Sequence, residues 1–242
     1  MYDRFSEIYD RLVFDIDYDA YAARILREFA LRGVPRGRLL ELGCGTGNLT
    51  LRLKEQFREI IAVDRSDAML SVAWNKSGGA ENIRWLCQDI RALDVPICDA
   101  AVSLLDTMNY LLSEEELRAA FQRVHDSLSP GGVFCFDLNT SRRLIEEIGE
   151  NTWIYETEGI FYTWESEVSG DIVDFQLTFF VKGEDGRYER IDETQTQRCH
   201  RMEDVCRLLG EIGFRDVRVV DLDTGEAASP ESRRLLFSMV RA

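Results

Sequence analysis

The chain lacks the features that mark several large classes of protein. Its six cysteines are scattered and form no C-x-x-C pair, so a metal site or a disulfide framework is not expected and reduced thiols are the default. No apolar run approaches the length of a membrane span, and the N-terminus has no basic segment followed by an apolar one. The sequence therefore predicts a soluble, cytoplasmic protein without a membrane partner.

Basic residues are in deficit. The chain has 29 Lys and Arg against 44 Asp and Glu, which gives a formal net charge of −15, and no cluster of basic residues interrupts this acidic excess. Such a field repels phosphate backbones and argues against a nucleic-acid partner. Neutral or cationic small molecules, amines among them, fit the charge better.

What the chain does contain is a glycine-rich turn in the stretch LLELGCGTGNLT. A short apolar run leads to Glu41, the turn carries Gly43, Gly45 and Gly47, and a helical pattern follows with Asn48 as its expected N-cap. Alternate glycines leave the turn without side-chain bulk, so that its backbone can approach a ligand closely. The N-terminus of the following helix offers free N–H groups to a carboxylate or another anion.

The run E-L-G-C-G-T-G-N resembles the first motif of the class I S-adenosylmethionine-dependent methyltransferases. Dinucleotide-binding domains also place a glycine turn after a strand, but their glycines are spaced G-x-G-x-x-G. Here the spacing is G-x-G-x-G, and an acidic residue ends the strand. The resemblance covers essentially the whole chain. The N-terminal helical segment and the alternating segment after residue 150 together resemble those of glycine and sugar N-methyltransferases.

The resemblance implies an α/β fold with a Rossmann-like seven-stranded, mostly parallel sheet whose last strand is antiparallel. Residues 1–35 carry two helical stripes and are expected to form a helical lid. Residues 36–140 and 200–242 are expected to form the S-adenosylmethionine-binding domain. In residues 150–199 apolar and polar side chains alternate and the helical periodicity is lost, which predicts an antiparallel β insertion.

The insertion is expected to contain three strands, near residues 160–168, 173–181 and 188–198, joined by hairpin turns. Among relatives such insertions form either a cap over the substrate or a homodimer surface, and the sequence leaves both open. Its aromatic side chains either line the substrate pocket or pack the core of the insertion itself.

The resemblance also assigns the cofactor site, which lies beyond the carboxyl ends of the strands. Asp64 would accept the ribose hydroxyls, Asp89 would accept a hydrogen bond from the adenine amino group, and the Ile90 backbone N–H would meet a ring nitrogen. The expected cofactor-binding residues are Glu41, Gly43, Cys44, Gly45, Gly47, Asn48, Asp64, Arg65, Met69, Gln88, Asp89, Ile90 and Leu105.

Four residues are candidates for acceptor contact or catalysis. Tyr9 lies on the first helical stripe and is expected to face the ligand from the lid, with a core position as the alternative. Asp106, Asn109 and Tyr110 follow the fourth strand, whose end lies beside the transferred methyl group in the family. Methyl transfer mainly requires alignment of the acceptor and exclusion of water, and it needs a general base only where the acceptor must lose a proton.

The sequence thus predicts an S-adenosylmethionine-dependent methyltransferase acting on a small molecule, with an amine preferred as acceptor. The fourth strand is not followed by the acid–proline–proline–tyrosine motif with which some family members grip a planar nitrogen, which argues against that type of chemistry. Two alternatives remain: a nicotinamide-dependent oxidoreductase, and a non-catalytic protein that binds S-adenosylmethionine.

Overall fold

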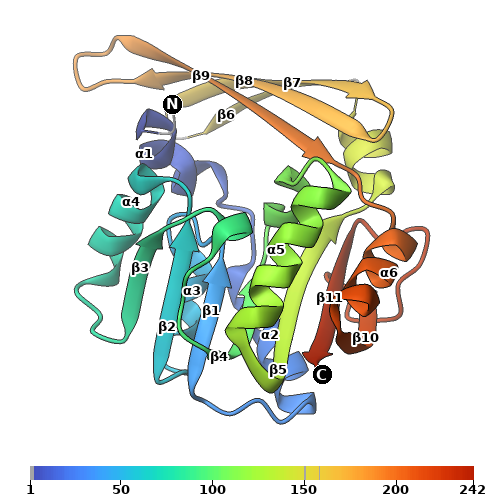
Figure 1. Cartoon of the computed structure of the whole chain (residues 1–242). Helices are drawn as coiled ribbons and strands as arrows, with labels where there is room; N and C mark the ends of the chain where they lie inside the picture. Colours follow the sequence, from blue (N-terminus) through green and yellow to red (C-terminus); the bar gives the residue numbers. More distant parts are fainter. Residues whose placement is uncertain (1–2, 150, 158) are drawn as a thin grey trace.

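The computed structural model describes residues 3–149, 151–157 and 159–242. Its main element is a seven-stranded sheet in the order β10-β11-β5-β4-β1-β2-β3 (Figure 1). The strands are β1 (Arg38–Leu42), β2 (Glu59–Asp64), β3 (Ile83–Cys87), β4 (Cys98–Ser103), β5 (Leu128–Asn139), β10 (Phe214–Asp221) and β11 (Arg234–Arg241). β11 runs antiparallel to both of its neighbours, whereas β1 to β5 pair in parallel. The expected mostly parallel sheet with an antiparallel last strand is confirmed.

Helices cover both faces of this sheet. α2 (Tyr18–Leu31), α3 (Asn48–Leu53) and α4 (Asp67–Ser77) contribute to one apolar core, and α5 (Glu114–Ser127) and α6 (Met202–Ile212) contribute to another on the opposite face. The central strands read as continuous apolar runs because both of their faces are buried. In the described part of the chain, no helix is both long and apolar enough to cross a membrane.

The second sheet has the order β6-β7-β8-β9 and lies over the carboxyl ends of the main strands (Figure 1). Its strands are β6 (Thr152–Thr157), β7 (Ile160–Ser169), β8 (Ile172–Lys182) and β9 (Tyr188–Arg198), all antiparallel. The expectation of three strands was therefore one too few. β6 is an edge strand that is largely exposed, so it lacks the alternation by which the other strands were recognised.

Helix α1 (Asp3–Leu12) lies beneath the inner face of this insertion. Phe5 of α1 packs on Phe179 of β8 with ring centroids 5.6 Å apart. Tyr162 and Phe175 belong to the same apolar cluster, which also includes Met69 of α4. The aromatic side chains of the insertion, Tyr162, Phe175 and Phe179, therefore bind it to helix α1 and to α4, and none of the three is among the residues that line the main pocket.

Candidate cofactor and acceptor site

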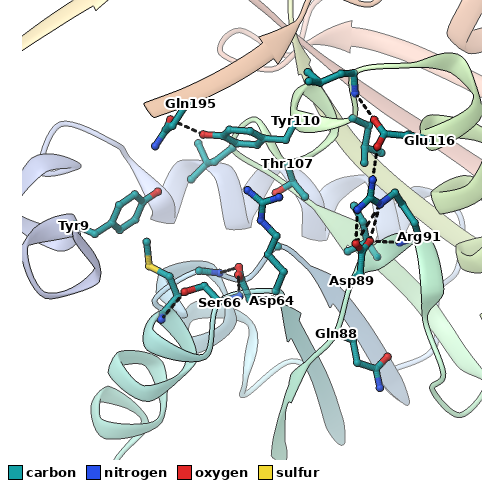
Figure 2. A pocket seen from close by; sticks show the side chains of 18 of the residues that line it. Tyr9, Asp64, Ser66, Gln88, Asp89, Arg91, Thr107, Tyr110, Glu116 and Gln195 are labelled. Atoms are coloured by element: carbon teal, nitrogen blue, oxygen red, sulfur yellow. Dashed lines mark hydrogen bonds and ion pairs between the residues drawn. The ribbon is translucent and has the colours of Figure 1, made fainter. Parts of the chain in front are cut away.

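A pocket of about 340 Å³ lies at the carboxyl ends of the main strands, between α1, the loop after β3 and strand β9 (Figure 2). This volume is in the range of small-molecule sites. It brings together eleven residues expected from the sequence: Tyr9, Gly43, Gly45, Asp64, Arg65, Met69, Gln88, Asp89, Ile90, Leu105 and Tyr110. A smaller adjoining hollow is lined by three more of them, Glu41, Cys44 and Asn48.

The three glycines of the turn all have positive φ, but for different reasons. A Cβ on Gly43 would lie 2.2 Å from the Thr107 hydroxyl oxygen, and one on Gly47 would lie 2.7 Å from the Trp85 ring. These two glycines are thus required by protein packing. Gly45 has no protein atom within 4 Å of such a Cβ and lines both hollows, so its open side is left for a ligand.

Asn48 does not cap the following helix. Gly47, in the left-handed conformation with φ of 78°, occupies the N-cap, and Asn48 is the first residue of α3. The side-chain amide of Asn48 instead donates to Asp10 at 2.8 Å. The expected N-cap role was therefore wrong, because the side chain is bonded to the lid helix.

Asp64 ends β2 at the floor of the pocket. Its Oδ2 accepts the Gly45 N–H at 2.8 Å, and its Oδ1 accepts the Ser66 N–H at 2.9 Å. Burial raises the pKa of Asp64 in spite of these two bonds. Each carboxylate oxygen has a further lone pair to offer, so Asp64 can accept the two hydroxyls of a ribose.

Glu41 lines the smaller hollow and is 2% exposed. Its Oε2 is buried without a hydrogen-bond partner among the residues that the structure describes. Burial raises the pKa of Glu41 to about 8. A buried oxygen of this kind calls for a donor, and the ammonium of the methionine part of S-adenosylmethionine would supply one.

The other end of the pocket is built around Asp89. Its carboxylate binds the guanidinium of Arg91, with a shortest contact of 2.5 Å, and the same guanidinium also pairs with Glu116 of α5 (Figure 2). The hydrogen bond from Arg91 lowers the pKa of Asp89. Glu116 in turn accepts the Leu112 N–H at 2.7 Å. Asp89 is thus ionised and can accept a hydrogen bond. The family resemblance predicts that this bond comes from the adenine amino group.

Two tyrosines face each other across the mouth of the pocket (Figure 2). Tyr110 donates its hydroxyl to Gln195 of β9 at 2.7 Å, which ties the segment after β4 to the insertion. Tyr9 enters from α1 and lines both hollows. Burial raises the pKa of Tyr9 well above its ordinary value, so its phenol stays protonated and is a hydrogen-bond donor rather than a base.

Three expected site residues, Gly47, Asp106 and Asn109, line neither hollow. Asn109 is fully buried, and its amide links the Arg198 carbonyl to the Asn139 N–H, which corrects the expectation of direct acceptor contact. Asp106 lies in an ion cluster with Arg234 at 2.6 Å. Burial would raise the pKa of Asp106, but the neighbouring guanidinium groups outweigh it and lower the pKa.

Other lining residues were not identified from the sequence, among them Thr107, Arg91, Glu116 and Gln195. Thr107 and Arg91 lie within two residues of predicted positions, so their proximity to the motif was the available signal. Glu116 lies in a run of three glutamates, and Gln195 lies on a strand rich in Thr and Gln, so nothing in the local sequence indicates that either residue lines a site.

Fold and site together define a class of protein. The domain is Rossmann-like, with an antiparallel strand inserted beside β5. The pocket offers Asp64 as an acceptor for a ribose diol, Asp89 as an ionised acceptor for an amino group, and an open face at Gly45. The adjoining hollow adds a buried Glu41 oxygen that has no partner among the described residues. These residues fit S-adenosylmethionine.

Comparisons with known proteins agree with this assignment. A family model described as "Methyltransferase domain" matches residues 39–132. A protein of Bacillus subtilis (strain 168) named as a methyltransferase is 34% identical, with 98% of this chain and 96% of the relative covered. The crystal structure of an S-adenosylmethionine-dependent methyltransferase from Clostridium acetobutylicum superposes with a TM-score of 0.91 at 32% identity, covering 100% of this chain and 99% of the other.

A more distant structural neighbour is the sugar N-methyltransferase KedS8 from Streptoalloteichus sp. Its TM-score is 0.80 at 23% identity, with 100% of this chain and 92% of that chain covered, which shows the shared fold. The chain belongs to the S-adenosylmethionine-dependent methyltransferases. It is therefore an enzyme with S-adenosylmethionine as its cofactor, which excludes the nicotinamide-dependent alternative.

Proposed function

We propose that this methyltransferase acts on an amine nitrogen of a small molecule. The observation that carries the proposal is the position of the β insertion over the pocket. The insertion lies over the strand ends, and the bond between Tyr110 and Gln195 joins it to the segment after β4 at 2.7 Å. A pocket covered on this side by the insertion favours a small acceptor over a polymer.

The preference for an amine rests on charge and on the residues at the mouth. A formal net charge of −15 attracts amines and repels phosphate-rich acceptors. The phenol oxygens of Tyr9 and Tyr110 can accept N–H groups of a neutral amine, which orients the nitrogen and leaves its lone pair free. The sugar N-methyltransferase KedS8 shares the fold, which supports the same acceptor class by analogy only.

S-adenosylmethionine, when bound, supplies a methyl group already activated by the positive sulfur. The residues of the chain then have three tasks. Asp64, Asp89 and Glu41 hold the cofactor, Tyr9 and Tyr110 align the acceptor nitrogen, and α1 with the insertion keeps water out. Alignment and exclusion of water are the main contributions that a protein makes to such a displacement.

The test is release of S-adenosylhomocysteine in the presence of a panel of amines, amino sugars and amino acids, with RNA and denatured protein as competing acceptor classes. Methylation of small amines, lost in Asp64→Ala together with cofactor binding, is the expected result. Asp67→Asn, an exposed acidic residue three positions further on, is the matched control. Activity confined to RNA or protein would contradict the proposal.

A further inference from the structure

The side chains that hold the Asp89 carboxylate also line the pocket. Arg91 lies at the centre of the short turn η1 (Ile90–Ala92), and its guanidinium lies between Asp89 and Glu116 of α5 (Figure 2). Asp89, Arg91 and Glu116 are all among the residues that line the pocket. Arg91 and Glu116 therefore lie beside the position at which the family resemblance places the adenine of the cofactor.

Arg91 uses most of the hydrogen-bonding capacity of the Asp89 carboxylate. Its backbone N–H donates to Oδ1 at 2.8 Å, and its Nη2 donates to Oδ2 at 2.5 Å. Its Nε lies between the two oxygens, at 3.0 Å from Oδ1 and 3.1 Å from Oδ2. An ionised carboxylate has about four lone pairs to offer, so these N–H groups leave one acceptor position over and fix its direction.

Glu116 holds Arg91 from the other side. Nη1 of Arg91 donates to Oε1 of Glu116, and Oε2 of Glu116 accepts the Leu112 N–H at 2.7 Å. The backbone N–H of Glu116 donates to Oγ of Ser113, the N-cap of α5, at 3.2 Å. Helix α5 thus fixes Glu116, Glu116 fixes the guanidinium, and the guanidinium fixes the rotation of the Asp89 carboxylate.

The backbone that carries Asp89 and Arg91 is held by other bonds. Nε2 of Gln88 donates to the Asp94 carbonyl at 3.2 Å, and Oε1 of Gln88 accepts the Asp94 N–H at 3.0 Å. The Asp89 side chain caps η1 through the backbone N–H of Arg91. The guanidinium of Arg91 is therefore not required to close the loop after β3, and its contacts serve the orientation of the carboxylate.

The ion pair is too exposed to contribute much to stability. The side chains of Arg91 and Asp89 are 40% and 39% exposed, and exposed pairs add little to the free energy of unfolding. The hydrogen bond from Arg91 nevertheless lowers the pKa of Asp89, and a guanidinium that binds both carboxylate oxygens fixes their direction. The arrangement is therefore better suited to recognition than to stabilisation.

We infer that Arg91 is a positioning residue for recognition of the nucleobase: it turns the remaining lone pair of Asp89 toward the 6-amino group of adenine, and Glu116 holds it in that orientation. An ionised carboxylate can only accept hydrogen bonds, so the site selects a base that carries an amino group at this position. This selection acts on the cofactor and is the same for any methyl acceptor.

The test compares S-adenosylhomocysteine with its purine analogue, which lacks the 6-amino group and keeps the ring nitrogens. Calorimetric titration gives the ratio of the two affinities for each variant. We expect the wild type to bind S-adenosylhomocysteine at least about tenfold more tightly, as for a hydrogen bond to a charged group. Arg91→Gln should weaken S-adenosylhomocysteine alone and lower the ratio to about threefold or less. Arg91→Lys, which keeps the charge without the planar fork, should give an intermediate ratio.

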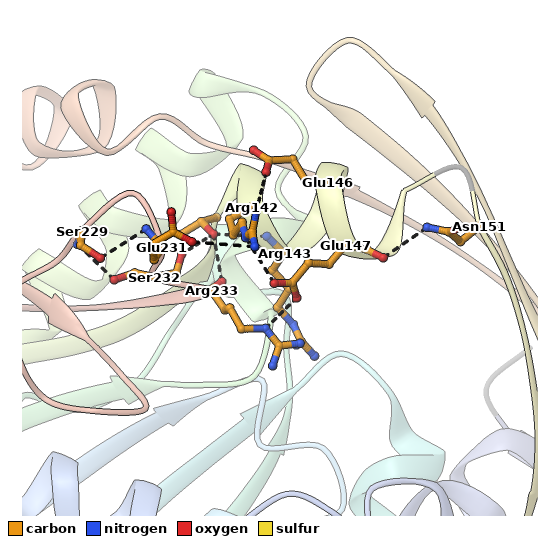
Figure 3. A network of polar contacts seen from close by, with 10 residues as sticks. Arg142, Arg143, Glu146, Glu147, Asn151, Ser229, Glu231, Ser232 and Arg233 are labelled. Atoms are coloured by element: carbon orange, nitrogen blue, oxygen red, sulfur yellow. Dashed lines mark hydrogen bonds and ion pairs between the residues drawn. The ribbon is translucent and has the colours of Figure 1, made fainter.

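Arg142→Gln is the matched control. Arg142, the first residue of η3 (Arg142–Ile148), also bridges acidic side chains, with Glu146 at 3.0 Å, Glu147 at 3.5 Å and Glu231 at 3.8 Å (Figure 3). Its side chain is 41% exposed and it lines neither hollow. Arg142→Gln should therefore keep the wild-type ratio, and thermal melts should show similarly small changes in both variants, because both arginines make exposed ion pairs.

A combination with Asp89→Ala separates positioning from direct contact. Asp89→Ala removes the acceptor and should make the affinities of the two ligands alike. Because Arg91 acts only through Asp89, the addition of Arg91→Gln to this variant should change neither affinity further.

Equal losses for the two ligands in Arg91→Gln would overturn the inference, because they would show direct contact with the purine ring or a general structural role. An unchanged ratio in Arg91→Gln would also overturn it, and so would a wild type that binds the two ligands equally well.

Discussion

The carboxylate of Asp10, on helix α1, accepts the hydroxyl of Thr46 in the glycine turn at 2.6 Å. The same carboxylate binds the Asn48 amide at 2.8 Å and the Lys76 ammonium at 2.6 Å. Partial burial would raise the pKa of Asp10, but these bonds outweigh it and lower the pKa. One side chain thereby links helix α1, the expected lid, to the glycine turn and to α4.

Replacement of Asp10 should therefore weaken cofactor binding although Asp10 lines neither hollow. In Asp10→Ala we expect a loss of about 1 kcal/mol in S-adenosylhomocysteine binding, since bonds to a charged group are strong but these are partly exposed. Calorimetric titration measures it. Glu7→Gln, on the exposed side of the same helix, is the control. Unchanged affinity in Asp10→Ala would show that the lid and the turn are independent.

Glu41 should make the unliganded protein less stable as pH rises. Its pKa is about 8 in the fold against 4.5 ordinarily, so between these values the folded state holds a proton that the unfolded state has lost. The free energy of unfolding then falls with pH, by at most about 1.4 kcal/mol per unit. Urea unfolding at pH 6.5 and 8 measures this. Glu41→Gln should flatten the dependence, and an equally steep dependence in this variant would contradict the assignment.

Tyr110 should matter for the acceptor rather than for the cofactor. Tyr110→Phe removes the hydroxyl that donates to Gln195, and we expect kcat/KM for the acceptor to fall by about 1 kcal/mol or several-fold. Binding of S-adenosylhomocysteine should be unaffected. Tyr155→Phe, on the exposed strand β6, is the control. A loss of cofactor affinity in Tyr110→Phe would contradict the separation of the two roles.

The glycine turn, Asp64 and Asp89 could be predicted because each lies at the end of its own strand or within two residues of it. The carboxyl ends of parallel strands meet at one edge, so local order in the sequence becomes proximity in space. The lid position of Tyr9 was predicted on the same basis of local pattern, and the structure places it against the pocket.

The ion cluster of Asp106 could not be predicted in this way. Arg234 is 128 positions further along the chain, and nothing local marks it as the partner of Asp106. Gln195 and Gln197 occupy inward positions of β9, but polar residues on an alternating strand normally indicate the solvent face. Only the three-dimensional structure, in which the insertion lies over the strand ends, shows that the face of β9 with Gln195 is turned toward the pocket.

Among the three glycines of the turn, Gly45 is the one at which a substitution can best distinguish an effect on ligand binding from an effect on stability. Its φ of 53° is close to the 61° of Gly78, the C-cap of α4, and neither position has a protein atom within 4 Å of an added Cβ. Gly45→Ala and Gly78→Ala should therefore carry the same backbone strain of about 1 kcal/mol and lower the thermal midpoint alike. Only at Gly45 does the methyl group point into a pocket, so only Gly45→Ala should weaken S-adenosylhomocysteine binding, by about tenfold or more. Titration of both variants, beside their thermal melts, measures the two effects separately. Equal affinities in the two variants would mean that the cofactor does not approach the turn at Gly45.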